Sequence, residues 1–306
     1  MRKHYLGIEI GGTKLQLVVG DDSAKIIERR HLAVDRAKGG AGIREQIKAT
    51  LAELIPAKKP AAVGVGFGGP VDWKTGEICR SHQIEGWADF KLGGWLQSLS
   101  GLPVRVDNDA NTGTLGEALH GAGVGFNPVC YVTLGSGVGG GLVVDGKIYH
   151  GAKPGETEIG HVRLDRSGTT VESRCSGWAV DAKIRQLKTT EPNSLLVTLI
   201  GDSTGGEARH LGAALKQGDV AARRIVDETG EDLAFGLSHV VHLFHPEVII
   251  LGGGLSLVGE PLRGAVESAL RRFTMEVFAP GPGIRLAALG EAAVPTGALE
   301  LAKSIG

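Results

Sequence analysis

Apolar residues occur along the chain in short runs that end in glycine, a pattern typical of β-strands joined by tight turns. Two stretches share the order of apolar run, glycine turn and second apolar run: residues 5–19 and residues 129–144. Asp145-Gly146 then predicts a further hairpin turn. A chain that begins twice with the same arrangement is predicted to contain two related halves and not one open sheet.

Other segments show helical spacing or strand-like runs. Ile43, Ile47, Leu51 and Leu54 recur at helical intervals, and Pro56 is expected to end that helix. The remaining predicted elements are strands over 62–67, 104–106 and 247–251, and helices over 92–99, 109–118, 260–273 and 295–305.

Composition and charge exclude several classes of partner. The chain has 306 residues, of which 42% are hydrophobic and 22% charged, enough for two domains of common size. Its net charge of -1 gives no reason to expect a nucleic-acid partner or an acidic membrane surface. No apolar stretch approaches the ~20 residues of a membrane helix, and Glu9 and Lys14 interrupt the first apolar run before a signal-peptide core forms. We therefore expect a soluble protein that is not exported.

Two residue types stand out in the composition. The three cysteines, Cys79, Cys130 and Cys175, are an odd number at long spacing, which fits neither a disulfide framework nor a paired zinc-knuckle pattern. We therefore expect a reducing, cytoplasmic environment. Glycine accounts for 49 residues, roughly twice the usual share of about 7%. Much of it follows apolar runs, which predicts backbone lying close against a ligand.

The first glycine turn has the residues of a phosphate site. Glu9 ends the first apolar run, and Gly11, Gly12, Thr13 and Lys14 follow it. Such a turn exposes backbone N–H groups to phosphate, and the acidic side chain can hold Mg²⁺ through water. The alternative is a plain hairpin in which Lys14 forms a salt bridge.

The second glycine turn contains the spacing G-x-G-x-x-G at Gly135, Gly137 and Gly140. In a dinucleotide-binding fold this motif must open a helix, but residues 141–146 read as a strand and a turn. We therefore reject the dehydrogenase interpretation. Two glycine hairpins that face one another are instead typical of the phosphate clamp of actin-like ATPases.

Polar residues in three further places are candidates for chemistry. Asn108 and Asp109 stand at a helix start after an apolar run, where a carboxylate can accept the proton of a reacting hydroxyl or simply cap the helix. Glu158 and His161, with Glu172 further on, are candidates to bind sugar hydroxyls, or else ordinary surface residues. The run 252–254 is all glycine and follows a buried strand, so it can contact adenine or serve tight strand-to-helix packing.

Together these segments resemble the ROK family of sugar kinases, and the resemblance spans nearly the whole chain. The motifs appear in family order: Ile8-Glu9-Ile10-Gly11-Gly12-Thr13-Lys14, Gly68-Gly69-Pro70-Val71, Asn108-Asp109-Ala110-Asn111, Leu134-Gly135-Ser136-Gly137-Val138-Gly139-Gly140-Gly141, Glu158-Ile159-Gly160-His161 and Leu251-Gly252-Gly253-Gly254.

The resemblance implies an α/β fold of two actin-like, ribonuclease H-like domains around a central cleft, commonly assembled as a homodimer. We expect a small N-terminal domain over residues 1–112, with the C-terminal helix 295–306 packing back on it. A large domain is expected over 113–294.

The resemblance also implies roles for individual residues. Asp109 would be the general base on the primary hydroxyl of the sugar. The sugar ligands would be Gly69, Asn108, Glu158, His161 and Glu172. The ATP phosphates would be held by Gly11, Gly12, Thr13, Lys14, Gly135, Ser136 and Gly137. Gly253 and Gly254 would border the adenosine.

Two departures from the family pattern change the expectations. The family usually follows the histidine of the Glu-x-Gly-His motif with a cysteine-rich zinc module, but residues 162–171 contain no cysteine. A closed structural zinc site needs about four N or S ligands, which His161 and Cys175 cannot complete, so we predict no zinc site. Thr170 then aligns with the last zinc cysteine. In addition, Glu9 stands where many members carry Asp.

The sequence thus predicts ATP- and Mg²⁺-dependent phosphorylation of the primary hydroxyl of a hexose. The sugar itself and the use of polyphosphate in place of ATP stay open. One alternative is a non-catalytic or regulatory sugar-binding protein. Another is a sugar-responsive repressor, which would carry a helix-turn-helix segment before a first strand that here begins by Tyr5.

Overall fold

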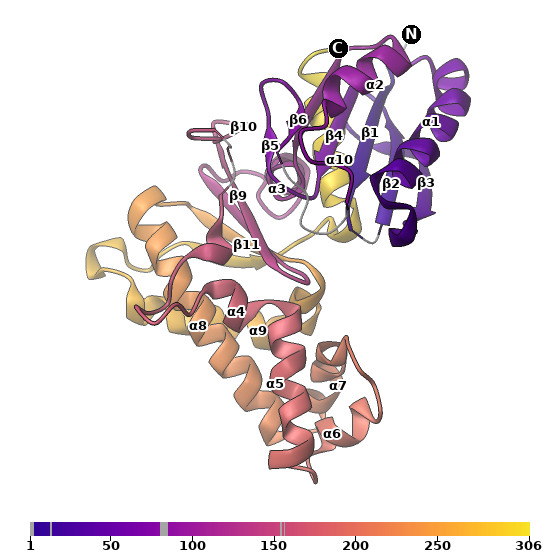
Figure 1. Ribbon diagram of the computed structural model, residues 1–306. Coiled ribbons are helices and arrows are strands. Elements are labelled where there is room, and N and C mark those ends of the chain that lie inside the picture. The colour runs from indigo at the N-terminus through magenta and orange to yellow at the C-terminus, as the bar shows by residue number, and fades with distance from the viewer. Residues whose placement is uncertain (1–2, 13, 80–84, 154, 156) are drawn as a thin grey trace. The chain divides into compact units, whose positions relative to one another are not determined.

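The computed structural model describes residues 3–12, 14–79, 85–153, 155 and 157–306 (Figure 1). Its first sheet has the strand order β3-β2-β1-β4-β7. The strands are β1 (Tyr5–Ile10), β2 (Lys14–Gly20), β3 (Ile26–Ala33), β4 (Val63–Phe67) and β7 (Val104–Asn108). β1, β2 and β3 are antiparallel, as the glycine turn predicted, whereas β4 pairs in parallel with both β1 and β7. A separate two-stranded sheet joins β5 (Val71–Asp72) and β6 (Glu77–Ile78).

Helices cover both faces of the first sheet (Figure 1). α1 (Gly39–Lys58) and α2 (Leu92–Ser100) pack their buried leucine and isoleucine side chains against one face. α10 (Ala293–Lys303) covers the other face, where Leu299 packs with Tyr5 and Val18. β4 allows this close approach because a methyl group at Gly64 would collide with the carbonyl oxygen of Ala298.

The second sheet has the order β10-β9-β8-β11-β12. The strands are β8 (Val129–Leu134), β9 (Val138–Val144), β10 (Lys147–Ile148), β11 (Val248–Gly252) and β12 (Gly283–Leu286). β11 is parallel to β8 and β12, and its residues are all buried. The strand, glycine turn and strand of β8 and β9 match the predicted second hairpin.

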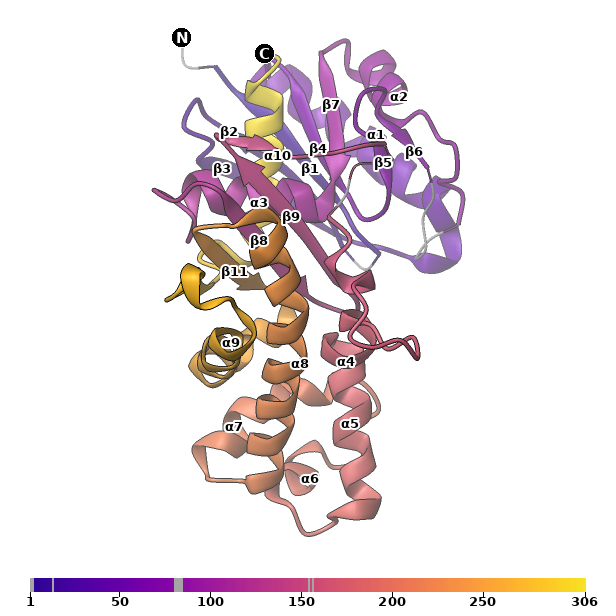
Figure 2. The same ribbon diagram turned by 90° about the vertical axis from the view of Figure 1, so that its left-hand side faces the viewer.

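The remaining helices include α3 (Asp109–His120), which precedes the second hairpin in sequence, and a group that follows it. That group comprises α4 (Val171–Cys175), α5 (Gly177–Thr190), α6 (Leu195–Ile200), α7 (Leu211–Lys216), α8 (Val220–Phe244) and α9 (Glu260–Phe273). Short 3₁₀ helices include η2 (Ile159–His161) and η4 (Gly254–Val258). Figure 2 shows the long α8 running beside α5 and α9.

The chain divides into two compact units. The first unit comprises Met1–Val124, Gly141–Thr157 and Glu291–Gly306, and the second comprises Gly125–Gly140 and Glu158–Gly290. These bounds differ from the predicted boundary after residue 112. All of α3 belongs to the first unit because α3 packs closely on α10, where a methyl group at Gly297 would collide with the carbonyl oxygen of Thr112.

Two differences from the predicted elements have clear physical causes. α1 continues past Pro56 to Lys58, because in the last turn proline removes only one N–H donor, and Lys59 ends the helix in a left-handed conformation. β3 was not predicted, because its sequence IIERRHLA carries charged residues in place of an alternating apolar pattern. Exposed charges of this kind are typical of an edge strand.

Candidate active site

Three strands of the first unit end side by side at one edge of the sheet. β1, β4 and β7 are parallel, and their last residues Ile10, Phe67 and Asn108 pair in one row. The chain turns just beyond that row, where Gly68 N–H donates to the Ile10 carbonyl at 2.8 Å. Because ligands of open α/β sheets bind outside the carboxyl ends of the strands, this edge is where chemistry is expected. The predicted residues lie at or just beyond these strand ends, or in the turn that leads into β2: Gly11, Gly12, Lys14, Gly69, Asn108 and Asp109.

Glu9, the penultimate residue of β1, forms a buried polar cluster with residues of the neighbouring strand. Its carboxylate lies 3.1 Å from Lys14 Nζ and accepts a 2.7 Å hydrogen bond from Gln16 Nε2. Burial raises the pKa of Glu9 above its ordinary value, although Lys14 opposes that effect. The salt bridge that was the plain alternative for this turn is therefore present. A metal contact by Glu9 would have to coexist with it, so the magnesium role stays a prediction.

The structure describes the turn between β1 and β2 except for Thr13. Gly11 N–H donates to the Lys14 carbonyl at 3.0 Å, and Arg36 Nε donates to the Gly12 carbonyl at 3.0 Å. Thr13, which was predicted to contact phosphate, lies outside the described residues.

Asn108 is the cap of α3, and its amide is heavily used. Its Oδ1 accepts the N–H groups of Ala110 and Asn111 at 2.8 and 3.1 Å. Its Nδ2 donates to the Gly69 carbonyl at 3.2 Å, which joins two predicted sugar ligands. Within the described part of the chain, the second amide hydrogen of Asn108 has no partner and can bind a ligand. The capping role and a binding role are thus compatible.

Asp109 has the electrostatic surroundings of a general base. Burial and the nearby negative charge of Glu9 raise its pKa to about 7. The hydrogen bond from Ala110 N–H favours the charged form and partly opposes this rise. A methyl group at Gly68 would lie 3.3 Å from Asp109 Oδ2, so the glycine turn after β4 and this carboxylate are neighbours. A base with a pKa near the operating pH is well matched to proton transfer.

The second unit contains the other glycine turn, which forms hydrogen bonds with residues of α4 and α5. Gly135 N–H donates to the Gly137 carbonyl at 2.9 Å, and the Gly135 carbonyl accepts the N–H of Gly177 at the start of α5 at 2.7 Å. Glu172 of α4 accepts the Val138 N–H at 2.9 Å. Ser136, at the tip, is exposed. The turn is therefore rigidly held while its tip stays accessible, which fits phosphate binding by backbone N–H groups.

Gly253 lies directly against the same turn. Its φ of 79° is in the left-handed region, and a methyl group there would lie 2.6 Å from the backbone of Leu134. Gly254, by contrast, has no described atom within 4 Å of a methyl group placed on it. Gly253 therefore packs against the end of β8, whereas the space beside Gly254 is open. This arrangement is compatible with the predicted contact to adenosine.

Glu158 precedes the short helix η2 and His161 is its last residue, and both are exposed. Gly160 between them packs against β9, because a methyl group there would collide with the Val138 carbonyl. The Val138 N–H in turn binds Glu172. Within the second unit, the structure therefore brings the three predicted sugar ligands to the start of β9.

Residues 162–171, the segment in place of a zinc module, form a compact hairpin. Arg163 and Thr170 pair as an antiparallel bridge, and Leu164 N–H donates to the Thr169 carbonyl at 2.9 Å. Asp165 Oδ1 accepts from Ser167, Gly168 and Thr169, and these bonds hold its pKa well below the usual range. Thr170 caps α4.

The donor chemistry does not fit zinc. Cys175 is buried, its thiol contacts the Thr229 carbonyl, and burial raises its pKa to about 12. Cys130 is buried in β8 with a pKa also raised to about 12. A zinc ligand must be a thiolate, so neither cysteine is suited. Among the residues that the structure describes, no group of three or more His, Cys, Asp or Glu could hold a metal ion.

Several residues at these sites were missed by the sequence analysis. Gln16 pairs with Glu9 across β1 and β2, a register that the hairpin itself could have revealed. Ser176 caps α5 beside Gly177, and a serine followed by helical spacing is a recognisable signal. Asp107 and His150 form a buried pair that no local motif marks.

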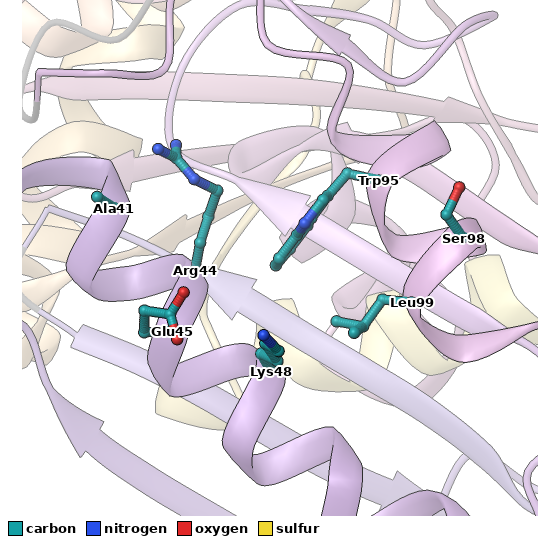
Figure 3. Close-up of a pocket in the computed structure, with 7 residues that line it drawn as sticks. All are labelled: Ala41, Arg44, Glu45, Lys48, Trp95, Ser98 and Leu99. Carbon is teal, nitrogen blue, oxygen red and sulfur yellow. The ribbon is translucent and has the colours of Figure 1, made fainter.

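A separate hollow lies between α1 and α2, with a volume of about 420 Å³ (Figure 3). The Trp95 ring and the side chains of Arg44 and Lys48 face it from opposite helices. Its lining includes none of the predicted site residues.

Across the described ranges, no helix has both the length and the apolar character needed to cross a bilayer.

Comparison with known proteins agrees with this arrangement. The model of the ROK family matches residues 5–305. A protein named glucokinase from Halalkalibacterium halodurans is 31% identical over 301 residues, covering 94% of this chain and 91% of that protein. A putative xylose repressor from Caldicellulosiruptor sp. is 28% identical, covering 83% of this chain and 67% of the repressor.

A solved structure supports the same conclusion. The ROK family glucokinase from Streptomyces griseus, in complex with glucose and AMPPNP, superposes with a TM-score of 0.85 at 31% identity, covering 99% of this chain and 100% of the other. The predicted α/β fold with two actin-like halves is confirmed by this likeness. The match of the family model over nearly the whole sequence shows that the chain belongs to the ROK family.

Proposed function

We propose that this protein is an ATP-dependent sugar kinase that phosphorylates the primary hydroxyl of a hexose. The observation that carries the proposal is the Asp109 carboxyl, with a pKa raised to about 7, at the strand ends beside Gly68. Relatives named glucokinase at about 30% identity support the same activity. ATP as donor is supported by the AMPPNP bound to the Streptomyces griseus relative.

In the proposed reaction, Asp109 accepts the proton of the sugar hydroxyl. The sugar oxygen forms a bond to the γ-phosphorus, the bond from that phosphorus to the bridging oxygen breaks, and ADP leaves with the electron pair. Asn108 and Gly69 orient the sugar in the first unit. Glu158, His161 and Glu172 are proposed to bind its other hydroxyls.

The chain's own groups would hold the nucleotide. Gly11, Gly12, Thr13 and Lys14, with Gly135, Ser136 and Gly137, would contact the phosphates, and Gly253 and Gly254 would border the adenosine. Mg²⁺, when bound with ATP, would neutralise charge on the phosphate oxygens, and Glu9 would contact it through water. Backbone N–H groups fixed before the reaction need no reorganisation when charge develops.

The second candidate is a regulatory sugar-binding protein, which the similarity to a putative xylose repressor favours. Catalytic and regulatory roles differ in one measurable product. We propose to incubate the protein with ATP, or with polyphosphate, and a panel of glucose, fructose, mannose and N-acetylated amino sugars, with and without zinc, and to measure ADP release. Release of ADP with at least one hexose supports the kinase. Sugar binding without any transfer supports the regulatory role and contradicts the kinase.

A homodimer and a cytoplasmic location also stay predictions. Sedimentation of the purified chain tests the first, and fractionation of cells that express it tests the second.

A further inference from the structure

A buried pair of side chains lies one residue before the Asn108-Asp109 motif and takes no part in the proposed reaction. Asp107 Oδ2 and His150 Nε2 are 2.6 Å apart, and their side chains are 1% and 8% exposed. An ionised carboxylate can only accept hydrogen bonds, so Nε2 carries the hydrogen. A polar pair removed from water to this degree is costly unless each member is fully bonded.

Asp107 connects this pair to the start of α3. Its Oδ1 accepts the backbone N–H of Asn108 at 2.9 Å and Asn111 Nδ2 at 3.1 Å. Asn108 caps the helix on which Asp109 is the first residue. The carboxylate of Asp107 therefore joins His150 to the backbone on which both predicted reacting residues are mounted.

His150 is held in turn by the segment around it. Its ring stacks on Trp73, with centroids 4.2 Å apart and planes 14° from parallel. Asn111 Nδ2 also donates to the Gly155 carbonyl at 2.9 Å, and Lys153 forms an ion pair with Asp72. All these residues belong to the first unit, and the chain passes into the second unit at Glu158.

Resting on the proposed function, we propose that His150 is a positioning residue for the sugar: through Asp107 it fixes the orientation of Asn108 and Asp109. It also fastens the segment that leads to Glu158 onto the start of α3. Without the Nε2–H donor, Oδ2 of the buried Asp107 carboxylate has no other partner among the described residues, so the carboxylate must shift or admit water. Either response moves the Asn108 backbone that it binds. A displacement of about 1 Å at a catalytic group can cost on the order of 10²-fold in rate.

Three variants separate positioning from packing. His150→Phe keeps a ring to stack on Trp73 but removes the donor, whereas His150→Gln restores a donor without the ring. The matched control is His120→Phe, which breaks another His-to-carboxylate pair, 2.7 Å from Glu300, at the opposite end of the same helix α3.

We would measure steady-state kinetics with sugar and ATP varied separately, together with hydrogen–deuterium exchange of residues 104–113. We expect His150→Phe to lower kcat/KM for the sugar on the order of 10- to 100-fold, to leave the KM for ATP within about twofold, and to speed exchange at residues 108–112. We expect His150→Gln to recover at least part of the rate and His120→Phe to behave as wild type. The inference is overturned if His150→Phe keeps wild-type kcat/KM and exchange, or if it raises the KM for ATP as much as the KM for the sugar.

The outcome stays separable from that of the proposed function. If wild-type protein releases no ADP with any sugar, the kinase proposal fails, and the exchange data with calorimetric sugar affinity then decide the role of His150. Selective loss of protection and of sugar affinity in His150→Phe, absent in His120→Phe, supports it. Equal protection and affinity in the two variants contradict it.

Discussion

Glu172 Oε2 accepts the backbone N–H of Val138 at 2.9 Å, which ties the first turn of α4 to the glycine turn between β8 and β9. Gly137 lies close beside it, because a methyl group there would collide with the same carboxylate oxygen and displace the Glu172 side chain. One side chain thus supports the proposed phosphate turn with one oxygen and leaves the other for the proposed sugar contact. The two roles can be separated by substitution.

Glu172→Gln keeps an oxygen acceptor for Val138, whereas Glu172→Ala removes it. We expect the Ala variant to lose about 1–3 kcal/mol of unfolding free energy and to raise the KM values for both sugar and ATP. The Gln variant should stay close to wild type in stability and raise mainly the KM for sugar. Chemical denaturation and two-substrate kinetics check this. A Gln variant with an unchanged sugar KM would remove Glu172 from the sugar site.

The activity should depend on the ionisation of Asp109. With its pKa near 7, kcat should rise as pH increases through neutrality, because only the carboxylate accepts a proton. Glu9→Gln removes the negative charge that raises this pKa, so it should shift the rising limb to lower pH. The pH profiles of kcat for both proteins check this. An unshifted limb in the Glu9 variant would mean that another group governs the profile.

The raised pKa of Asp109 also predicts an effect on stability. A carboxyl that holds its proton more tightly when folded contributes stability below its unfolded pKa near 4, and this contribution is lost as pH rises through about 7. Asp109→Asn should therefore be more stable than wild type at pH 8, and the difference should shrink at pH 5. Thermal unfolding at both pH values tests this. Equal Tm differences at the two pH values would argue against a raised pKa.

Gly253 and Gly254 form a matched pair for testing the glycine run. Gly253→Ala requires a left-handed conformation and a contact of 2.6 Å with Leu134, so it should cost at least about 1–3 kcal/mol and weaken ATP binding. Gly254→Ala meets open space and should change stability by less than about 0.5 kcal/mol. Denaturation and nucleotide titration measure both. Equal effects of the two substitutions would contradict the close packing at Gly253.

The hairpin of residues 162–171 should be stable without metal. We expect chelator treatment followed by added Mg²⁺ to leave Tm and activity unchanged. Asp165→Asn should lower Tm at pH 7, because the charged carboxylate accepts three hydrogen bonds. Since the pKa of Asp165 is depressed, its contribution is fully present above pH 4 and decreases as pH falls below that value, so the Tm difference between the two proteins should shrink in acid. Zinc-dependent recovery after chelation would contradict this prediction.

How far the sequence could predict this structure depended on whether a residue's partner was local. The strands and turns around Gly11 and Gly135, and the helix 260–273, were predictable because their signals lie in consecutive residues. The pairing of Asp107 with His150 was not, because 43 residues separate the two and neither belongs to a motif. The place of α3 in the first unit likewise depends on a glycine contact with α10 at the far end of the chain.

The raised pKa of Asp109 could not be predicted from the sequence either, because it depends on residues that are distant in the chain. Asp109 alone reads as a helix cap as readily as a base, and only burial beside Glu9 raises its pKa toward 7. Pro56 shows the opposite error, since a local rule was applied where one missing N–H in a last turn has little consequence.

The most direct test of the account compares wild type with Asp109→Asn under saturating ATP, Mg²⁺ and the best hexose of the panel. ADP release is measured alongside NMR identification of the phosphorylated carbon. We predict phosphate on the primary hydroxyl with wild type, and a loss of at least about 10²-fold in kcat for the variant while sugar binding stays measurable. Wild-type turnover by Asp109→Asn would contradict the assignment of Asp109 as the base, and phosphate on a ring hydroxyl would contradict transfer to the primary hydroxyl.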